Sequence, residues 1–198
     1  RLREVTLLHD LIRSARPRHW VKNTFVLAAP LFSGHLFLAP DLFRSLGAMT
    51  AFIGASSAIY LINDITDRQQ DRLHHLKATR PIASGRLSPS VAAGAAAALV
   101  VSCLVGGWLL AESFALIIAL YVVIQLAYSF WLKNVVLLDV LAIAAGFLLR
   151  AVGGAVAIHV EISTWFILCT FTLTLLMATV KRRQELVELG EVATHHRH

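Results

Sequence analysis

Long apolar segments alternate with short polar stretches along most of this chain. Six of the apolar segments approach the roughly 20 residues that a helix needs to cross a bilayer, namely residues 21–37, 42–62, 89–111, 113–132, 135–158 and 164–180. Backbone groups inside a bilayer must be hydrogen-bonded within their own segment, so each segment is expected to be helical. The pattern predicts an all-α fold, a polytopic transmembrane helical bundle with six spans.

The charged residues support this prediction and orient the bundle. The 198-residue chain is 57% hydrophobic and only 15% charged, far from the composition of a soluble domain. All Lys and Arg residues except Arg44 and Arg150 fall in the N-terminal stretch from Arg1 to Lys22, the 68–86 loop, Lys133 and the tail from Lys181. These are alternate ends of a six-helix zigzag, and the positive-inside rule places them in the cytoplasm. We expect a multi-pass protein of the inner or plasma membrane whose active site faces the cytoplasm.

We expect one integral-membrane domain over residues 1–198, with a cytoplasmic amphipathic arm at 1–18 and a cytoplasmic loop at 63–88. The arm carries apolar residues on one face and is expected to lie in the membrane interface. The pI near 9.9 is explained by the positive-inside bias and by anionic lipid or phosphate partners, and the sequence holds no nucleic-acid-binding motif. Cys103 and Cys169 lie within spans and are expected to be small packing residues.

The most informative polar segment follows the second apolar run, where Asn63 precedes Asp64, Asp67 and Asp71. If the helix continues past Ile62, the three carboxylates stand at i, i+3 and i+7 and share one face. Like charges so close repel one another, and Mg²⁺ would relieve that repulsion because it prefers carboxylate oxygens, waters and substrate phosphates. We therefore predict that Asp64, Asp67 and Asp71 are catalytic residues that bind Mg²⁺, with Asn63 adding a neutral oxygen or orienting a ligand.

Basic residues follow the acidic segment at a distance suited to phosphate binding. Lys77 and Arg80 lie just beyond the carboxylates, and Arg is suited to bidentate phosphate contact whereas Lys acts as a point charge. The alternative is a solvated cytoplasmic loop that carries charges of both signs for solubility, and the position at the membrane edge disfavours it. His74 is a weaker candidate for metal or substrate contact.

Further candidates lie where other spans meet the cytoplasm. Arg18, Lys22 and Asn23 stand at the entrance of the first apolar segment, either as a clamp on a substrate phosphate or as interface anchors. Lys133 is either a snorkelling anchor or a ligand for a substrate phosphate. Tyr128 precedes it by about one and a half helical turns and favours the second interpretation.

Two ionisable residues lie inside the fifth apolar segment, where such groups are functional-site hypotheses by default. Asp139 is nearer the cytoplasm and is the better candidate, whereas Arg150 is equally well explained as a helix–helix contact. The sixth segment closes with Lys181, Arg182 and Glu185, which we include among the substrate-binding candidates.

These motifs resemble a known family. Asn-Asp-x-x-Asp-x-x-x-Asp at 63–71, with Lys-x-x-Arg-Pro at 77–81, resembles the first signature of the UbiA superfamily of membrane transferases. Two other stretches are similar to the decaprenyl-phosphate phosphoribosyltransferase branch of that superfamily, namely Arg-Pro-Arg-His-Trp-Val-Lys-Asn at 16–23 and Tyr-Ser-Phe-Trp-Leu-Lys at 128–133. The resemblance extends over residues 16–185.

The resemblance implies a helical bundle around a central cavity open to cytoplasm and lipid. It implies transfer of 5-phosphoribose from phosphoribosyl diphosphate to a polyprenyl (decaprenyl) phosphate, with Mg²⁺ as cofactor, in the synthesis of cell-wall arabinan precursors. Membrane lipid is a further partner, and the sequence leaves a homo-oligomer open. The family usually has nine spans, so C-terminal helices are expected to be lacking from this chain.

One departure from the family pattern separates the alternatives. Aromatic prenyltransferases of the superfamily carry a second Asp-rich motif after the sixth span, whereas residues 181–185 read Lys-Arg-Arg-Gln-Glu. This disfavours the first alternative, an Mg²⁺-dependent polyprenyl-diphosphate transferase acting on an aromatic acceptor. The second alternative is a non-catalytic lipid-binding membrane protein, which predicts that Asn can replace Asp64, Asp67 and Asp71 without consequence.

Overall fold

A computed structural model describes residues 2–132 and 135–195 of the chain, apart from the side chains of 2–5, 136, 181 and 185–195. These residues form helices and connecting turns, and no strand occurs among them, which confirms the all-α prediction. The long helices are α3 (Ala39–Thr66), α5 (Pro89–Leu110), α6 (Glu112–Phe130), α7 (Val136–Ala157) and α8 (Thr164–His195). The short helices, with η denoting 3₁₀ geometry, are α1 (Leu2–Ser14), η1 (Pro17–Leu27), α2 (Ala28–Phe32), η2 (His35–Phe37), α4 (Arg68–Leu73) and η3 (Lys77–Thr79).

Local signals explain where several of these helices begin. Pro89 stands in the first turn of α5, where its missing N–H would have had no helical partner. The hydroxyl of Ser88 accepts a hydrogen bond from the N–H of Val91 at 3.3 Å and caps the same end. Pro40 starts α3 in the same way, and Pro17 starts η1.

The long helices have the length and apolar composition of membrane spans, and there are five of them in the described part of the chain. The prediction of six spans is wrong for the first, because residues 21–37 fall in η1, α2 and η2 rather than in one helix. Pro30 explains the break, since it has no N–H to donate to the carbonyl of Val26 four residues earlier. At ideal rises of about 2.0 and 1.5 Å per residue, η1 and α2 together still extend about 30 Å, close to the thickness of the hydrocarbon core.

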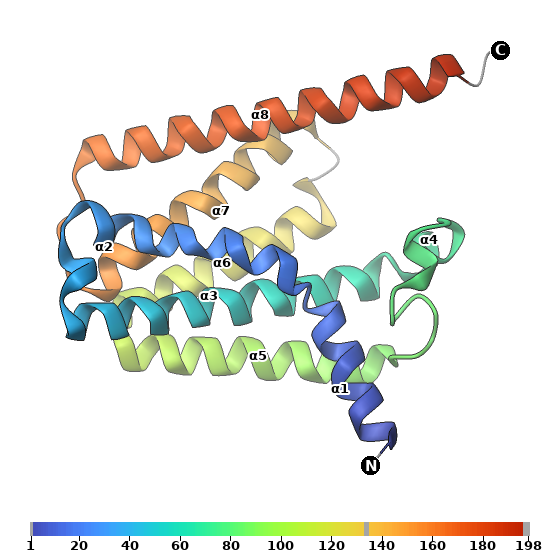
Figure 1. Cartoon of the computed structure of the whole chain (residues 1–198), viewed down its shortest axis with the longest axis horizontal. Helices are drawn as coiled ribbons and strands as arrows, with labels where there is room; N and C mark the ends of the chain where they lie inside the picture. Colours follow the sequence, from blue (N-terminus) through green and yellow to red (C-terminus); the bar gives the residue numbers. More distant parts are fainter. Residues whose placement is uncertain (1, 133–134, 196–198) are drawn as a thin grey trace.

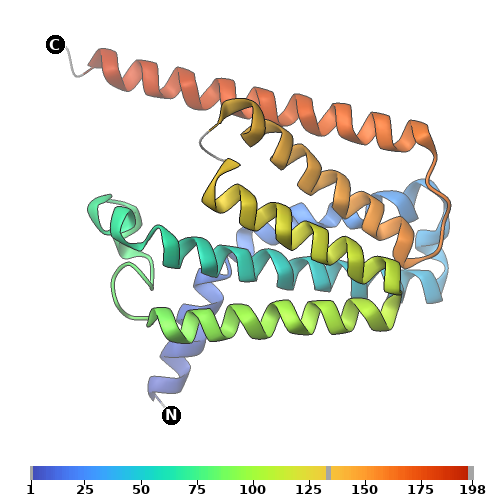
Figure 2. The ribbon, with the colours of Figure 1, turned by 180° about the vertical axis from the view of Figure 1, so that it is seen from behind.

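The segment η1 packs against both α3 and α7. Around it, α5 packs on α3 and α6, α6 packs on α7, and α8 lies along α7 at the edge of the bundle (Figures 1 and 2). The close approach of η1 and α7 requires Gly154, where a Cβ would lie 1.8 Å from the carbonyl oxygen of Val26. This carbonyl belongs to the residue four positions before Pro30, so the helix break and the close approach occur at the same place.

The two ends of the bundle differ. The start of α1, the loop with α4 and the C-terminal end of α8 lie toward one end (Figure 1). At the opposite end, Arg44 of α3 donates from Nε to the carbonyl of Ala157 and from Nη2 to the carbonyl of Leu110, both at 2.7 Å. One side chain thus satisfies C-terminal carbonyls of α7 and α5 that have no partner within their helices. This explains one of the two cations that lie outside the predicted cytoplasmic clusters.

The helix α1 crosses the bundle near the start of α5 (Figure 1), and its Leu11 packs against a buried cluster that includes Leu61 of α3. Its buried Asp10 accepts a hydrogen bond from Nε of Arg86 at 3.3 Å, which ties α1 to the turn before α5. Leu7, Leu8 and Ile12 are exposed. Its location in the membrane interface stays a prediction.

Candidate functional site

The acidic segment lies where α3 ends and α4 begins. The helix does not continue through Asp71, because α3 ends at Thr66 and Asp67 occupies its C-cap before α4 starts. Asp64 and Asp71 are nevertheless close neighbours, since both contact the same nitrogen of Arg80. Proximity of these two carboxylates therefore arises from the turn between the helices and not from a shared helix face.

Two arginines neutralise the buried carboxylates. Nη1 of Arg80 lies 2.6 Å from Oδ2 of Asp71 and 3.2 Å from Oδ1 of Asp64, and Nη2 of Arg16 also contacts Oδ1 of Asp64. Asp64 and Asp71 are only 2% and 3% exposed, and ions so buried need partners of opposite charge to offset their desolvation. The sequence predicts Arg80 as a phosphate ligand, and the structure places it between the two acids.

The role of Arg16 could not be predicted from the sequence. Its backbone is left-handed, with φ of 53°, a conformation that costs a residue with a side chain on the order of 1 kcal/mol. Its guanidinium lies over the ring of Tyr60, 4.9 Å from the centroid, and reaches Asp64. The single local signal was its position before Pro17, which disfavours a right-handed helical backbone at residue 16.

The acidic cluster has oxygen donors that suit Mg²⁺. The described side chains include no group of three or more His, Cys, Asp or Glu residues placed to hold a metal by themselves. Mg²⁺ does not require such a group, because it usually binds one or two carboxylates together with waters and substrate phosphates. Asp64 and Asp71 supply two carboxylates, and Oδ1 of the adjacent Asn63 is buried without a hydrogen-bond partner. A buried carbonyl oxygen without a partner is costly, so these residues fit a bound cation.

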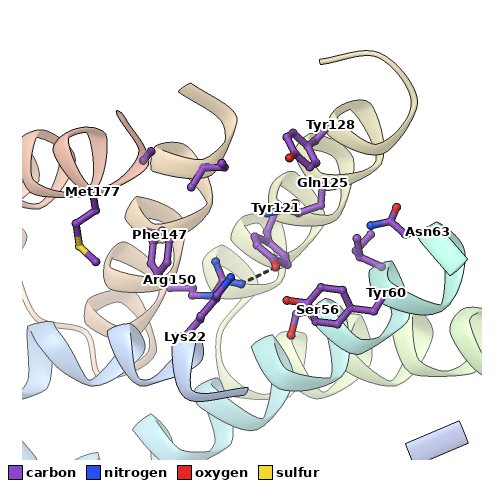
Figure 3. A pocket seen from close by; sticks show the side chains of 13 residues that line it. Lys22, Ser56, Tyr60, Asn63, Tyr121, Gln125, Tyr128, Phe147, Arg150 and Met177 are labelled. Carbon is purple, nitrogen blue, oxygen red and sulfur yellow. Dashed lines mark hydrogen bonds between the residues drawn. The ribbon is translucent and has the colours of Figure 1, made fainter. Parts of the chain in front are cut away.

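A cavity of about 340 Å³ extends from this segment into the bundle. Elements η1, α3, α6, α7 and α8 form its walls, and its polar lining consists of Lys22, Ser56, Tyr60, Asn63, Tyr121, Gln125, Tyr128 and Arg150 (Figure 3). Asn63 is adjacent to Asp64 and also lines the cavity, so the cavity begins beside the carboxylates. Lys22 and Tyr128, two of the residues predicted to bind substrate, are brought together here.

Arg150 of α7 is held in one orientation on the cavity wall. Nε donates to Oδ1 of Asn23 at 2.7 Å, Nη2 donates to the hydroxyl of Tyr121 at 2.7 Å, and Nη1 donates to the carbonyl of Gly146 at 2.8 Å. The contact between Arg150 and Tyr121 is drawn in Figure 3. The helix–helix contact considered for Arg150 is therefore present, and it joins α7 to α6 and η1.

The charge of Arg150 has no carboxylate partner among the described side chains, although the residue is only 5% exposed. Rings of Tyr121, Phe147 and Phe52 surround the guanidinium, with the Tyr121 centroid nearest at 4.8 Å. A cation–π contact contributes about 0.5–2 kcal/mol, whereas an unpaired buried ion costs several kcal/mol. The neutral partners therefore leave a net positive charge at the cavity wall.

Asn23 is fully buried, and its contacts differ from those of a phosphate clamp. Oδ1 accepts the hydrogen bond from Arg150, and Nδ2 donates to Oγ of Ser56 at 3.4 Å. The amide thus orients Arg150 from η1. A polar residue in an apolar segment was the signal in the sequence, but its partner in α7 was not visible there.

The remaining candidates are spread over the same end of the bundle. Asp139 and Arg182 form an ion pair across 3.8 Å that links α7 to α8. Arg18 and Lys77 are exposed. Lys133 lies outside the described residues, as do the side chains of Lys181 and Glu185, whose predicted roles stay predictions.

Comparison with known proteins places these features in a family. The profile of the UbiA prenyltransferase family matches residues 25–188. Decaprenyl-phosphate phosphoribosyltransferase of Mycolicibacterium smegmatis is 42% identical over 184 residues, which cover 91% of this chain and 58% of that protein. The protein of the same name from Corynebacterium glutamicum is 38% identical over 185 residues, 91% of this chain and 56% of its own length. This chain therefore spans less than two thirds of these relatives.

The fold agrees with this match. A UbiA homolog from Archaeoglobus fulgidus, whose structure was solved with DMAPP and Mg²⁺ bound, has a TM-score of 0.72 to this chain. The superposition covers 84% of this chain and 60% of that chain at 22% sequence identity, and it shows a shared arrangement of helices. From the profile match and the shared helical membrane fold, this multi-pass protein belongs to the UbiA prenyltransferase family.

Proposed function

We propose that this chain forms the site of a transferase that moves 5-phosphoribose from phosphoribosyl diphosphate to a polyprenyl phosphate and releases diphosphate. The observation that carries this proposal is a buried pair of acids beside a cavity whose wall holds two cations, Lys22 and Arg150. This arrangement suits a ligand with a metal-bound diphosphate at one end and a second anionic group at the other. The names of relatives that match 91% of this chain support decaprenyl phosphate as the acceptor.

Asp64, Asp67 and Asp71 would hold Mg²⁺ at the mouth of the cavity, with Asn63 as a further oxygen donor. A bound Mg²⁺ ion would neutralise charge on the leaving diphosphate. The oxygen donors of Asp64, Asp71 and Asn63 support this assignment, and so does the Mg²⁺ found in the solved family member from Archaeoglobus fulgidus.

The arginines beside the acids would have different partners in the empty site and in the site with bound diphosphate. Arg16 and Arg80 pair with Asp64 and Asp71 in this structure. A diphosphate that arrives with its own divalent cation offers these guanidinium groups phosphate oxygens in place of carboxylate oxygens. Lys77 is exposed beyond the acids and would meet the outer phosphate.

The other predicted residues would bind the second phosphate of the donor and the phosphate of the lipid. Lys22 and Tyr128 line the cavity. The remaining cations of this group are Arg18, Lys133, Lys181 and Arg182, whereas Asp139 pairs with Arg182 and Asn23 orients Arg150. The assignment of these cations to one phosphate or the other rests on the charge and position of each in the sequence.

The reaction requires alignment of the two substrates and stabilisation of charge rather than a strong base. The acceptor phosphate is already anionic at pH 7, so its oxygen can attack C1 of the ribose as the diphosphate leaves. Positive charge develops on the sugar as the diphosphate leaves, so catalysis would depend on neutralisation of the leaving diphosphate and on alignment of the two substrates. The apolar surface of α6, α7 and α8 gives the polyprenyl tail a route between helices into the bilayer.

We place the site at the cytoplasmic face of the plasma membrane. The loop with α4, the start of α1 and the end of α8 lie toward the same end of the bundle (Figure 1), and the loop and the end of α8 carry the Lys and Arg clusters at 68–86 and from Lys181. The positive-inside rule supports a cytoplasmic location for that end. Phosphoribosyl diphosphate is a soluble anion that would enter from this side.

A transfer assay with two donors tests the proposal. Membranes that contain the protein are incubated with Mg²⁺ and either labelled phosphoribosyl diphosphate plus polyprenyl phosphate or labelled prenyl diphosphate plus an aromatic acid. We expect label in the lipid phase with the first pair, its loss on chelation of Mg²⁺, and no prenylated aromatic product with the second. The opposite preference would assign the chain to the aromatic prenyltransferases.

A further inference from the structure

The cavity wall has two parts at different depths in the bundle. Asn63 marks the part beside the acids, and Ser56 and Arg150 line the deeper part. Asn63 and Ser56 are seven residues apart on α3, which corresponds to about 10 Å along the helix axis. The cavity is therefore long enough for a ligand with anionic groups at both ends, and the acids with their metal would bind only one of them.

The deeper part contains a guanidinium that is positioned without being neutralised. Asn23, Tyr121 and Gly146 take one N–H each from Nε, Nη2 and Nη1 of Arg150. A guanidinium has five N–H groups, so Nη1 and Nη2 each keep one N–H beyond the hydrogen bonds found in the described part of the chain. All three acceptors are neutral, and the positive charge is retained beside the cavity.

A second cation lines the same cavity. Lys22 comes from η1, the segment that also supplies Asn23, and Tyr60 and Tyr128 add hydroxyl groups from α3 and α6 (Figure 3). A rigid guanidinium, an ammonium group and hydroxyl donors together match the oxygens of a phosphate monoester.

We propose that Arg150, together with Lys22, binds a phosphate monoester in the deeper part of the cavity, and that Asn23 and Tyr121 are positioning residues for Arg150. The inference deepens the proposed function and rests on it for the identity of the ligand. Two substrates of that reaction carry a phosphate monoester: the donor, on C5 of its ribose, and the polyprenyl phosphate. The chemistry is shared, so the experiment must separate the two sources.

Binding measurements on the purified protein in nanodiscs separate them without requiring turnover. The probes are ribose 5-phosphate for the donor, farnesyl phosphate for the lipid, and magnesium diphosphate for the acidic end. We expect Arg150→Met to raise the Kd of one monoester about tenfold or more, with less than about a twofold change for magnesium diphosphate. Tyr121→Phe should weaken the same monoester to a smaller extent, and the monoester affected identifies the source. Arg13→Gln, which removes an exposed cation of α1, serves as the matched control.

The outcomes are distinguishable. A folded Arg150→Met protein that binds both monoesters like the wild type would show that Arg150 only connects helices, and failure of the wild type to bind either monoester would overturn the proposal equally. If Arg150→Met does not fold, Arg150→Lys and Tyr121→Phe decide, because unchanged monoester affinity in both contradicts a guanidinium-specific site. Arg150-dependent binding without any phosphoribosyl transfer would retain the site and refute the proposed reaction.

Discussion

Arg150 of α7 donates from Nε to Oδ1 of Asn23 in η1 across 2.7 Å, and both side chains are buried. The contact joins a membrane-spanning helix to the segment that takes the place of the predicted first span. Because the acceptor is a neutral amide, the guanidinium is oriented but keeps its charge. The pair therefore links the packing of the bundle to the electrostatics of the cavity.

Replacing Asn23 by Asp should separate stability from activity. A carboxylate at this position would pair with Arg150 and cancel its charge, so we expect a melting temperature equal to or above that of the wild type. The same change should lower kcat/KM for transfer about tenfold or more, because the phosphate would face a neutral pair. Thermal unfolding in nanodiscs and initial rates measure the two effects. A lower melting temperature with an unchanged rate would contradict this interpretation of the pair.

Gly154→Ala should destabilise the bundle. The added Cβ would lie 1.8 Å from the backbone oxygen of Val26, and backbone cannot move aside as a flexible side chain can. We expect a loss of about 2–3 kcal/mol or more, the upper range for overpacking. Gly94→Ala in α5 is the control, because nothing lies within 4 Å of its added Cβ, and a helical Gly→Ala change there should be neutral or stabilising. Equal melting temperatures for the two variants would mean that η1 does not pack on α7 as described.

Arg44→Met tests the link at the other end of the bundle. The change removes the donors that satisfy the carbonyls of Ala157 and Leu110, and each lost hydrogen bond should cost about 1–3 kcal/mol where the carbonyl stays unpaired. Chemical denaturation should show reduced stability, while the rate of transfer in the folded fraction stays at the wild-type value. A large loss of rate in fully folded protein would show instead that this end of the bundle participates in the reaction.

The rate of transfer should depend strongly on the carboxylates of Asp64 and Asp71. Asp64→Asn and Asp71→Asn each remove a charge that faces Arg80, and each should lower kcat/KM about 100-fold or more if the carboxylates hold the catalytic cation. Raising the Mg²⁺ concentration should recover part of the rate. Wild-type rates in both variants would favour the non-catalytic, lipid-binding alternative.

Hydropathy predicts the long helices well, because a bilayer leaves the backbone few alternatives to a helix. It fails over residues 21–37, where Pro30 removes a backbone donor and Gly154, far along the chain, allows the close approach of the buried carbonyl of Val26. Composition and length do not reveal the contact between Gly154 and Val26. The segment has the hydropathy of a span but the geometry of a 3₁₀ helix followed by one short α-helix.

In the site, too, a local feature could be predicted from the sequence, whereas contacts between residues far apart in the chain could not. Spacing of the Asp residues identified an acidic segment at a helix end, although the helix breaks at Asp67 and the two buried acids meet through Arg80. The contact of Arg16 with Asp64 joins positions 48 apart, and that of Arg150 with Asn23 joins positions 127 apart. Pairings of this kind depend on how the helices pack, so a single sequence without its fold does not reveal them.

We propose that the acids between residues 64 and 71 serve transfer of phosphoribose to a lipid phosphate. Mass spectrometry of lipid extracts tests this role, after membranes with the protein are incubated with phosphoribosyl diphosphate, decaprenyl phosphate and Mg²⁺. We expect a lipid whose mass exceeds that of the acceptor by one phosphoribosyl group, formed by the wild type and absent with folded Asp64→Asn protein. Equal amounts of this lipid from both proteins, or none from the wild type, would refute this role of the acids.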